Sequence, residues 1–192
     1  SNITSAALHG VRLLGFATSA SVALRAGLDS AATHEELLDQ QAYGRVSWTQ
    51  FGDTGGWSLT ERGRTENERL LAAELDRAGG RGALTRIHER FLPVNARLQE
   101  ACTRWQLRPT ASDPLAPNDH ADETWDQQVL AELDAVANSL ATLEAELSTV
   151  LPRFAGYHDR FSAALLARRV DDQADSCHRV WFELHEDLIA RS

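Results

Sequence analysis

Two long runs of apolar residues at steps of three and four constrain the fold of this chain more than any other feature. The longer run steps by 4, 4, 3, 4, 3, 4 and 3 through Trp125, Val129, Leu133, Val136, Leu140, Leu143, Leu147 and Val150. The earlier run passes through Ile87, Phe91, Val94, Leu98, Ala101 and Trp105. Such spacing lays a continuous apolar stripe along a helix. Because the polar, proline-bearing segment 108–122 separates the two runs, they predict two long antiparallel helices.

The rest of the C-terminal half is also expected to be helical. Pro93 lies inside the earlier run, so we expect a kink or a break there. Pro152 should end the long helix, and residues 153–170 and 175–190 again carry helical apolar spacing. This half therefore predicts an α-helical bundle, which either stands alone or supplies a dimerisation surface.

A glycine-rich junction, Gly79-Gly80-Arg81-Gly82, divides the chain into expected domains of residues 1–80 and 83–192. Residues 1–82 carry 8 arginines and 10 acids, a net charge of −2, whereas residues 83–192 carry 11 and 18, a net charge of −7. All basic residues are arginine, so every contact with a phosphate would come from a guanidinium. The total charge of −9 argues against a nucleic-acid protein, because affinity for DNA comes largely from neutralising phosphates.

Nothing in the sequence indicates a membrane protein or an enzyme. No stretch approaches the ~20 apolar residues of a membrane span, and the start Ser1-Asn2-Ile3-Thr4 is not a signal peptide. Cys102 and Cys177 form neither a disulfide framework nor a zinc motif, and we expect reduced thiols in a cytoplasmic protein. No Ser-His-Asp order, phosphate loop, dinucleotide fingerprint, CxxC or HExxH occurs, so no catalytic residue, cofactor or metal is expected.

The first 80 residues predict short elements in a definite order. Helices are expected over 4–15, from Thr18 or Ser19 to Ala26, and from an Asp29 cap to about Tyr43, before Gly44. Residues 45–51 alternate like a strand, 52–56 are expected to form a hairpin tip, and 57–59 return as a second strand. A fourth helix is expected over 60–78.

This order resembles the winged helix-turn-helix of MarR-type and PadR-type transcriptional regulators. The segment 22–28, VALRAGL, is similar to the second helix and turn of that motif, and the 16-residue step from Leu28 to Gly44 matches its third helix. The segment 57–64, WSLTERGR, is similar to the LTxxGR that closes the wing. The resemblance covers about residues 5–78, and the second half is similar to that of uncharacterised bacterial winged-helix proteins. It implies a homodimer that binds duplex DNA in transcription regulation and senses a small-molecule effector.

Mapping the motif onto this chain assigns seven DNA-binding residues. They are Ser30, His34 and Glu35 near the bases, and Arg25, Arg45, Arg62 and Arg64 at the phosphates. The expected third helix, however, contains Glu35, Glu36 and Asp39 and no arginine, and the expected hairpin tip has no arginine either. The alternative is a winged helix that never touches DNA and serves protein interaction or small-molecule sensing.

Other polar clusters have a structural and a functional interpretation. Five arginine and aromatic residues either line a ligand pocket between the two halves, suited to an anionic or aromatic molecule, or belong to a packed domain junction. These residues are Arg104, Trp105, Arg108, Arg153 and Tyr157. Asp119 and His120 are expected to form a turn before an Asp122 cap, and His178 and His185 lie ~10 Å apart along a helix, too far to share a metal.

Overall fold

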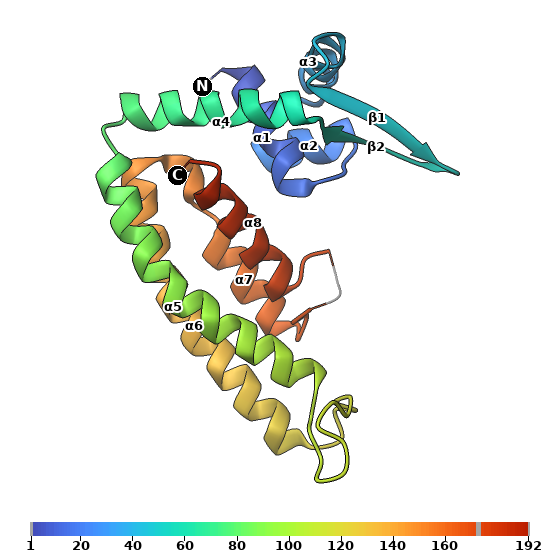
Figure 1. The fold of residues 1–192 in the computed structure, drawn as a ribbon, viewed down its shortest axis with the longest axis vertical. Helices are drawn as coiled ribbons and strands as arrows, with labels where there is room; N and C mark the ends of the chain where they lie inside the picture. Colours follow the sequence, from blue (N-terminus) through green and yellow to red (C-terminus); the bar gives the residue numbers. More distant parts are fainter. Residues whose placement is uncertain (1, 172–173, 192) are drawn as a thin grey trace. The chain divides into compact units, whose positions relative to one another are not determined.

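The computed structural model describes residues 2–171 and 174–191, and this part of the chain is mainly α-helical with one two-stranded antiparallel sheet (Figure 1). In chain order the elements are α1 (Ile3–Leu14), α2 (Ser19–Ala26), α3 (Ser30–Ala42), β1 (Val46–Phe51), β2 (Thr54–Leu59), α4 (Glu61–Arg77), α5 (Arg81–Gln106), α6 (Glu123–Val150), the 3-10 turn η1 (Pro152–Phe154), α7 (Tyr157–Leu166) and α8 (Cys177–Ile189). The prediction of a mainly α fold is confirmed. Within the described ranges, no helix combines the length and the apolar character that crossing a membrane requires.

The chain forms two compact units, each with its own core. Unit 1 contains residues 2–77 and 186–191, and unit 2 contains residues 78–185. The sequence predicts domains of 1–80 and 83–192, whereas the structure assigns 186–191 to unit 1. The reason is a buried polar network in which Asp187 and Arg191, at the end of α8, meet His9 of α1.

The helices of unit 1 begin at side-chain caps and enclose one apolar core. Asn2, Thr18 and Asp29 each accept a hydrogen bond from a backbone N–H in the first turn of α1, α2 and α3. The core residues are Ala7, Leu8, Val11, Ala17, Val22, Leu37, Val46 and Trp57. Helices α1, α2 and α3 and the sheet therefore share a single hydrophobic centre.

The β1–β2 hairpin is tighter than the sequence predicts. Its register runs from Val46 opposite Leu59 to Phe51 opposite Thr54, so only residues 52 and 53 form the tip. The expected tip of 52–56 was too long, because Gly55 and Gly56 belong to β2. A Cβ atom on Gly55 would lie 2.3 Å from the Trp48 ring, and one on Gly56 would lie 2.8 Å from the Phe16 ring. The glycines are therefore strand residues that leave space for aromatic rings.

The start of α4 packs against the segment 44–45 that precedes β1. Thr60 accepts a hydrogen bond from Gly63 N–H at 3.0 Å, and its hydroxyl donates to the Gly44 carbonyl at 2.6 Å. A Cβ on Gly63 would lie 1.8 Å from the carbonyl oxygen of Arg45. The TERGR segment is therefore explained by a helix cap and by an approach of two backbones that only glycine permits.

In unit 2, α5 and α6 lie side by side and run antiparallel (Figure 1), as the two apolar runs predict. The guanidinium of Arg90 is paired with Glu146, and that of Arg104 donates to Gln128. The apolar stripes of both helices are buried against each other and against α7 and α8 within this unit. The heptads therefore do not themselves require a second copy of the chain.

Two details of unit 2 differ from expectation. Of the kink or break expected at Pro93, the break does not occur, because α5 continues through this residue with Phe91 and Leu98 fully buried on either side. The predicted helix over 153–170 is divided into η1 and α7, because Gly156 adopts φ 108° between them. The backbone N–H of Gly156 donates to Glu144 of α6 at 2.9 Å, and this bond holds the break in place.

Candidate nucleic-acid interface

Helix α3 is placed by the turn that follows α2. Gly27 adopts a left-handed conformation at φ 66°, and the N–H of Leu28 returns to the carbonyl of Ala23 at 2.9 Å. Asp29 then caps α3 by accepting from Ala32 N–H at 2.9 Å. Two helices joined by such a short turn present the second one to solvent along its outer side.

The inner side of α3 is partly polar, yet its polar groups are bonded. Thr33, Leu37 and Gln40 are buried. The Thr33 hydroxyl donates to the Asp29 carbonyl at 2.7 Å, and the Gln40 amide donates to Glu36 at 2.9 Å and accepts from Arg45 at 3.0 Å. Buried polar groups with partners cost little, so α3 packs without a continuous apolar stripe.

A chain of hydrogen bonds fixes His34 on the exposed flank of α3. The buried Trp57 donates its indole N–H to Ser19 Oγ at 2.9 Å, and Ser19 Oγ lies 2.9 Å from His34 Nδ1. The Ser19 hydroxyl can either donate to Nδ1 or accept from it, so the tautomer of the ring decides the direction of this bond. The His34 ring is therefore held in one orientation on the exposed flank. Helical spacing places Ser30 and Gln41, both exposed, on the same flank.

The acids of α3 do not all face outward. Glu36 Oε1 accepts from the Thr4 hydroxyl at 2.6 Å as well as from Gln40, so its carboxylate is turned toward α1. Glu35 and Asp39 are exposed. Of the three acidic residues in the sequence of α3, two are therefore on its outer side, Glu35 and Asp39.

The four arginines assigned to phosphate contacts differ in availability. Arg45 donates to Gln40, lies 3.7 Å from Glu66 and has its guanidinium 5.0 Å from the Tyr43 ring centroid. Arg25 is half-buried in the last turn of α2. Arg62 and Arg64, by contrast, are exposed at the start of α4 and form no ion pair with any residue that the structure describes. Of the four assigned arginines, these two are therefore the most available for a phosphate contact.

One acid of α4, Glu66, is already paired with Arg45 and Arg69. The hydrogen bond from Arg69, helped by the nearby charge of Arg45, holds the pKa of Glu66 below its usual value. Glu66 is therefore charged and paired at neutral pH, and it engages Arg45 rather than leaving it to a ligand.

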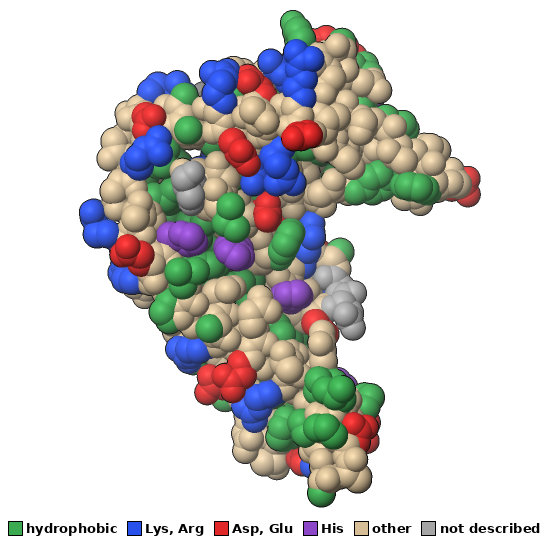
Figure 2. Space-filling model, in the orientation of Figure 1, with side chains coloured by type: hydrophobic (Ala, Val, Ile, Leu, Met, Phe, Trp, Pro, Cys, Tyr) green, Lys and Arg blue, Asp and Glu red, His purple; other side chains and the backbone are tan. Residues whose placement is uncertain are grey.

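The hairpin carries aromatic side chains instead of positive charge. Trp48 and Phe51 of β1 have exposed fractions of 42% and 68%, and Phe16, from the turn between α1 and α2, lies against Gly56 of β2 and is 39% exposed. The Phe16 and Phe51 ring centroids are 6.2 Å apart. Figure 2 shows hydrophobic side chains along the hairpin and an acidic one at its tip, where the register places Asp53. This surface has no cation that could follow a phosphate backbone.

The five residues proposed as a ligand pocket fall into two groups at opposite ends of α6. Arg104 and Arg108 lie near the Trp125 ring, with guanidinium-to-centroid distances of 4.8 Å and 6.0 Å, and Trp105 is buried close by. Arg153 and Tyr157 follow the other end of α6, which is roughly 42 Å away at 1.5 Å per residue. They do not form one pocket with the first group.

The segment before α6 contains a cluster whose geometry sequence spacing could not reveal. Asp126 is 1% exposed, and its two oxygens accept from Asn118 and from His120 Nδ1, each at 2.9 Å. The His120 ring lies on Trp105 with centroids 4.5 Å apart, and its backbone adopts φ 58°. Asp122 caps α6 as predicted. Among residues 2–171 and 174–191, no group of three or more His, Cys, Asp or Glu side chains is close enough to hold a metal.

The chain was compared with protein-family models, with curated proteins and with solved structures, and none of the three comparisons gave a match.

Proposed function

We propose that unit 1 is a winged helix-turn-helix that binds duplex DNA and regulates transcription, with α3 in the major groove. The observation that carries this proposal is the hydrogen-bond chain from Trp57 through Ser19 to His34. It holds an imidazole ring in one orientation on an exposed helix flank, where a ring nitrogen could hydrogen-bond to base edges in the major groove. Ser30 and Gln41 on the same flank add two further polar side chains that could contact bases.

The charge distribution supports a particular kind of binding. Of the four arginines assigned to phosphates, Arg62 and Arg64 are exposed and have no ion pair among the described residues, whereas Glu35 and Asp39 repel phosphates from the outer side of α3. Non-specific affinity should therefore be low, and recognition should depend on base contacts. For about two phosphate contacts per copy, the logarithm of the association constant should fall with the logarithm of salt concentration at a slope near −2.

A fluorescence-anisotropy titration of the full chain tests this proposal. A labelled mixed-sequence duplex at low salt should bind weakly, and the affinity should fall as salt is added. Arg62→Ala with Arg64→Ala should reduce the slope by about 2 on every sequence. The matched control removes two exposed arginines of unit 2, Arg86 and Arg97, and should leave the slope unchanged. Absence of binding by folded protein at low salt would overturn the proposal.

A second test addresses base reading. His34→Ala should lower the affinity for a selected sequence by about 1–3 kcal/mol and leave mixed-sequence binding unchanged. Ser19→Ala should do the same more weakly, since it releases the ring without removing it. An equal loss on all sequences would mean that His34 contacts the backbone and reads no base.

The exposed aromatics of the hairpin favour a second candidate, a module that binds another protein and not DNA. Trp48 and Phe51 of the hairpin, with Phe16 packed beside it, offer apolar area where DNA-binding wings carry cations, and Asp53 lies at the tip. Under this candidate Phe51→Ser abolishes partner capture while the double arginine variant does not. We further propose, from the resemblance alone, that two copies associate so that two α3 helices meet half-sites ~34 Å apart. Sedimentation velocity at micromolar concentration tests the dimer.

A further inference from the structure

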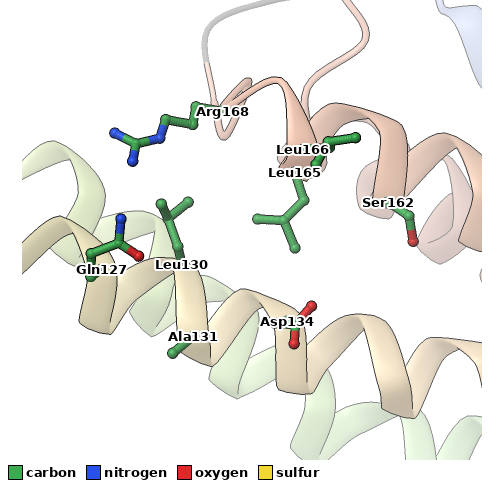
Figure 3. Close-up of a pocket in the computed structure, with 8 residues that line it drawn as sticks. All are labelled: Gln127, Leu130, Ala131, Asp134, Ser162, Leu165, Leu166 and Arg168. Carbon is green, nitrogen blue, oxygen red and sulfur yellow. The ribbon is translucent and has the colours of Figure 1, made fainter.

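A groove of about 430 Å³ runs between α6 and α7 in unit 2 (Figure 3). Leu130 of α6 and Leu165 of α7 face each other across its middle. Leu166 also lines the groove although its side chain is 89% exposed. The volume lies in the range of small-molecule sites, roughly 300–1,000 Å³. The groove is therefore large enough for a small molecule with an apolar body.

The polar groups at the two ends of the groove are not equivalent. At one end Arg168 and Gln127 both donate to Glu123, at 2.9 Å and 2.8 Å, so the positive charge there is already neutralised. The hydrogen bond from Arg168 also lowers the pKa of Glu123. At the other end the exposed carboxylate of Asp134 points toward α7 and has no hydrogen-bond or ion-pair partner among the described residues (Figure 3). The unsatisfied charge of the groove is negative.

The charge of the surrounding unit acts in the same direction. Residues 78–185 carry 16 acidic and 11 basic side chains, a net charge of −5. A field of this sign concentrates cations near the surface and disfavours anions. It is opposite to the sign that an arginine-and-aromatic pocket would require.

We propose that the α6–α7 groove binds a small organic cation, an ammonium carried on an apolar chain or ring. The ammonium pairs with Asp134, and the apolar body covers Leu130, Leu165 and Leu166. This inference does not depend on DNA binding by unit 1, and neither its ligand nor its residues involve that unit.

Three molecules of the same shape and different charge test the proposal on the full chain. The probes are 4-phenylbutylammonium, 4-phenylbutanol and 4-phenylbutyrate, and the readouts are isothermal titration calorimetry and backbone amide shifts in ¹H–¹⁵N spectra. The ammonium should bind most tightly and shift amides within 127–134 and 162–168. Equal binding of all three probes, tighter binding of the carboxylate, or shifts confined to other segments would overturn the proposal.

Variants then separate the charge from the apolar wall. Asp134→Asn should weaken ammonium binding roughly three- to tenfold without changing alcohol binding. Leu166→Ser should weaken both, by roughly fivefold, and because that side chain is exposed the fold should not suffer. Asp159→Asn, at a side chain of α7 that is 95% exposed, is the matched control and should have no effect. Self-association that Asp134→Asn abolishes would assign the groove to a second copy of the chain instead.

Discussion

The buried polar network at the end of α8 should contribute strongly to the stability of unit 1. Asp187 is 2% exposed, and its Oδ1 accepts from His9 Nε2 at 3.0 Å and from Arg191, which is 1% exposed. Asn67 Nδ2 lies 3.4 Å from His9 Nδ1, and Arg12 donates to Asn67 Oδ1 at 3.2 Å. Residues of α1, α4 and α8 thus share one buried set of charges and hydrogen bonds.

Replacing Asp187 by asparagine should destabilise unit 1 strongly. The change leaves the Arg191 guanidinium buried without its counter-charge, and breaking a buried pair in this way costs about 3–5 kcal/mol. Against a typical total stability of about 5–15 kcal/mol, this is roughly a fifth or more of the free energy of unfolding. The melting temperature should fall by roughly 6–20 °C.

Chemical denaturation with amide hydrogen exchange checks this prediction and locates the effect. The amides of α1 and α4 should lose protection while those of α5 and α6 keep it. The double variant Asp187→Leu with Arg191→Met removes both charges and should cost less than the two single changes added together. Asp159→Asn serves as the exposed control. A loss below about 1 kcal/mol for Asp187→Asn, or strict additivity in the double variant, would refute the reasoning.

Three further predictions concern the cap of α4 and the thiols. Gly63→Ala should destabilise the protein by about 3 kcal/mol in urea denaturation, since the new Cβ meets the Arg45 carbonyl at 1.8 Å; a neutral result would contradict this backbone contact. Thr60→Val removes a helix cap and should cost about 1–2 kcal/mol by the same measurement, with no change expected in α6 exchange. Burial raises the pKa of both Cys102 and Cys177 to about 12, above the ~8.5 of an unfolded thiol, so their contribution to stability is complete below pH 8.5 and is lost as pH rises toward 12. Denaturation curves should show this decline, and substitution of both thiols by alanine should remove it.

Local patterns predicted most helices of this fold, because each depends on residues within one or two turns. Asp29 and Asp122 cap α3 and α6 as their sequence neighbours indicate. The prediction of the hairpin tip was wrong because glycines are typical of turns, and the sequence does not show that the rings of Trp48 and Phe16 lie against Gly55 and Gly56. The need for glycine at these two strand positions comes from side chains that are distant in the sequence.

The candidate site depends even more on distant partners. Helical spacing predicts that His34 is exposed, but it does not predict how the ring is oriented. The ring is held by Ser19, which lies 15 positions earlier in the chain, and Ser19 is in turn bonded to Trp57, 38 positions later. The inward turn of Glu36 depends on Thr4 of α1. Hydrophobic periodicity cannot predict these contacts, because they form only when separate elements pack together.

The assignment of residues 186–191 to unit 1 has a consequence for how the chain folds during synthesis. The 108 residues of unit 2 are translated between the bulk of unit 1 and the segment that brings Asp187 and Arg191 to it. At about 5–20 residues per second, residues 2–77 wait roughly 5 to 20 s with Arg12 and His9 lacking their final partners. Of the two units, the one whose synthesis begins earlier is therefore completed later, and a chain shortened before residue 186 leaves the buried polar groups of α1 without their partners from the end of α8.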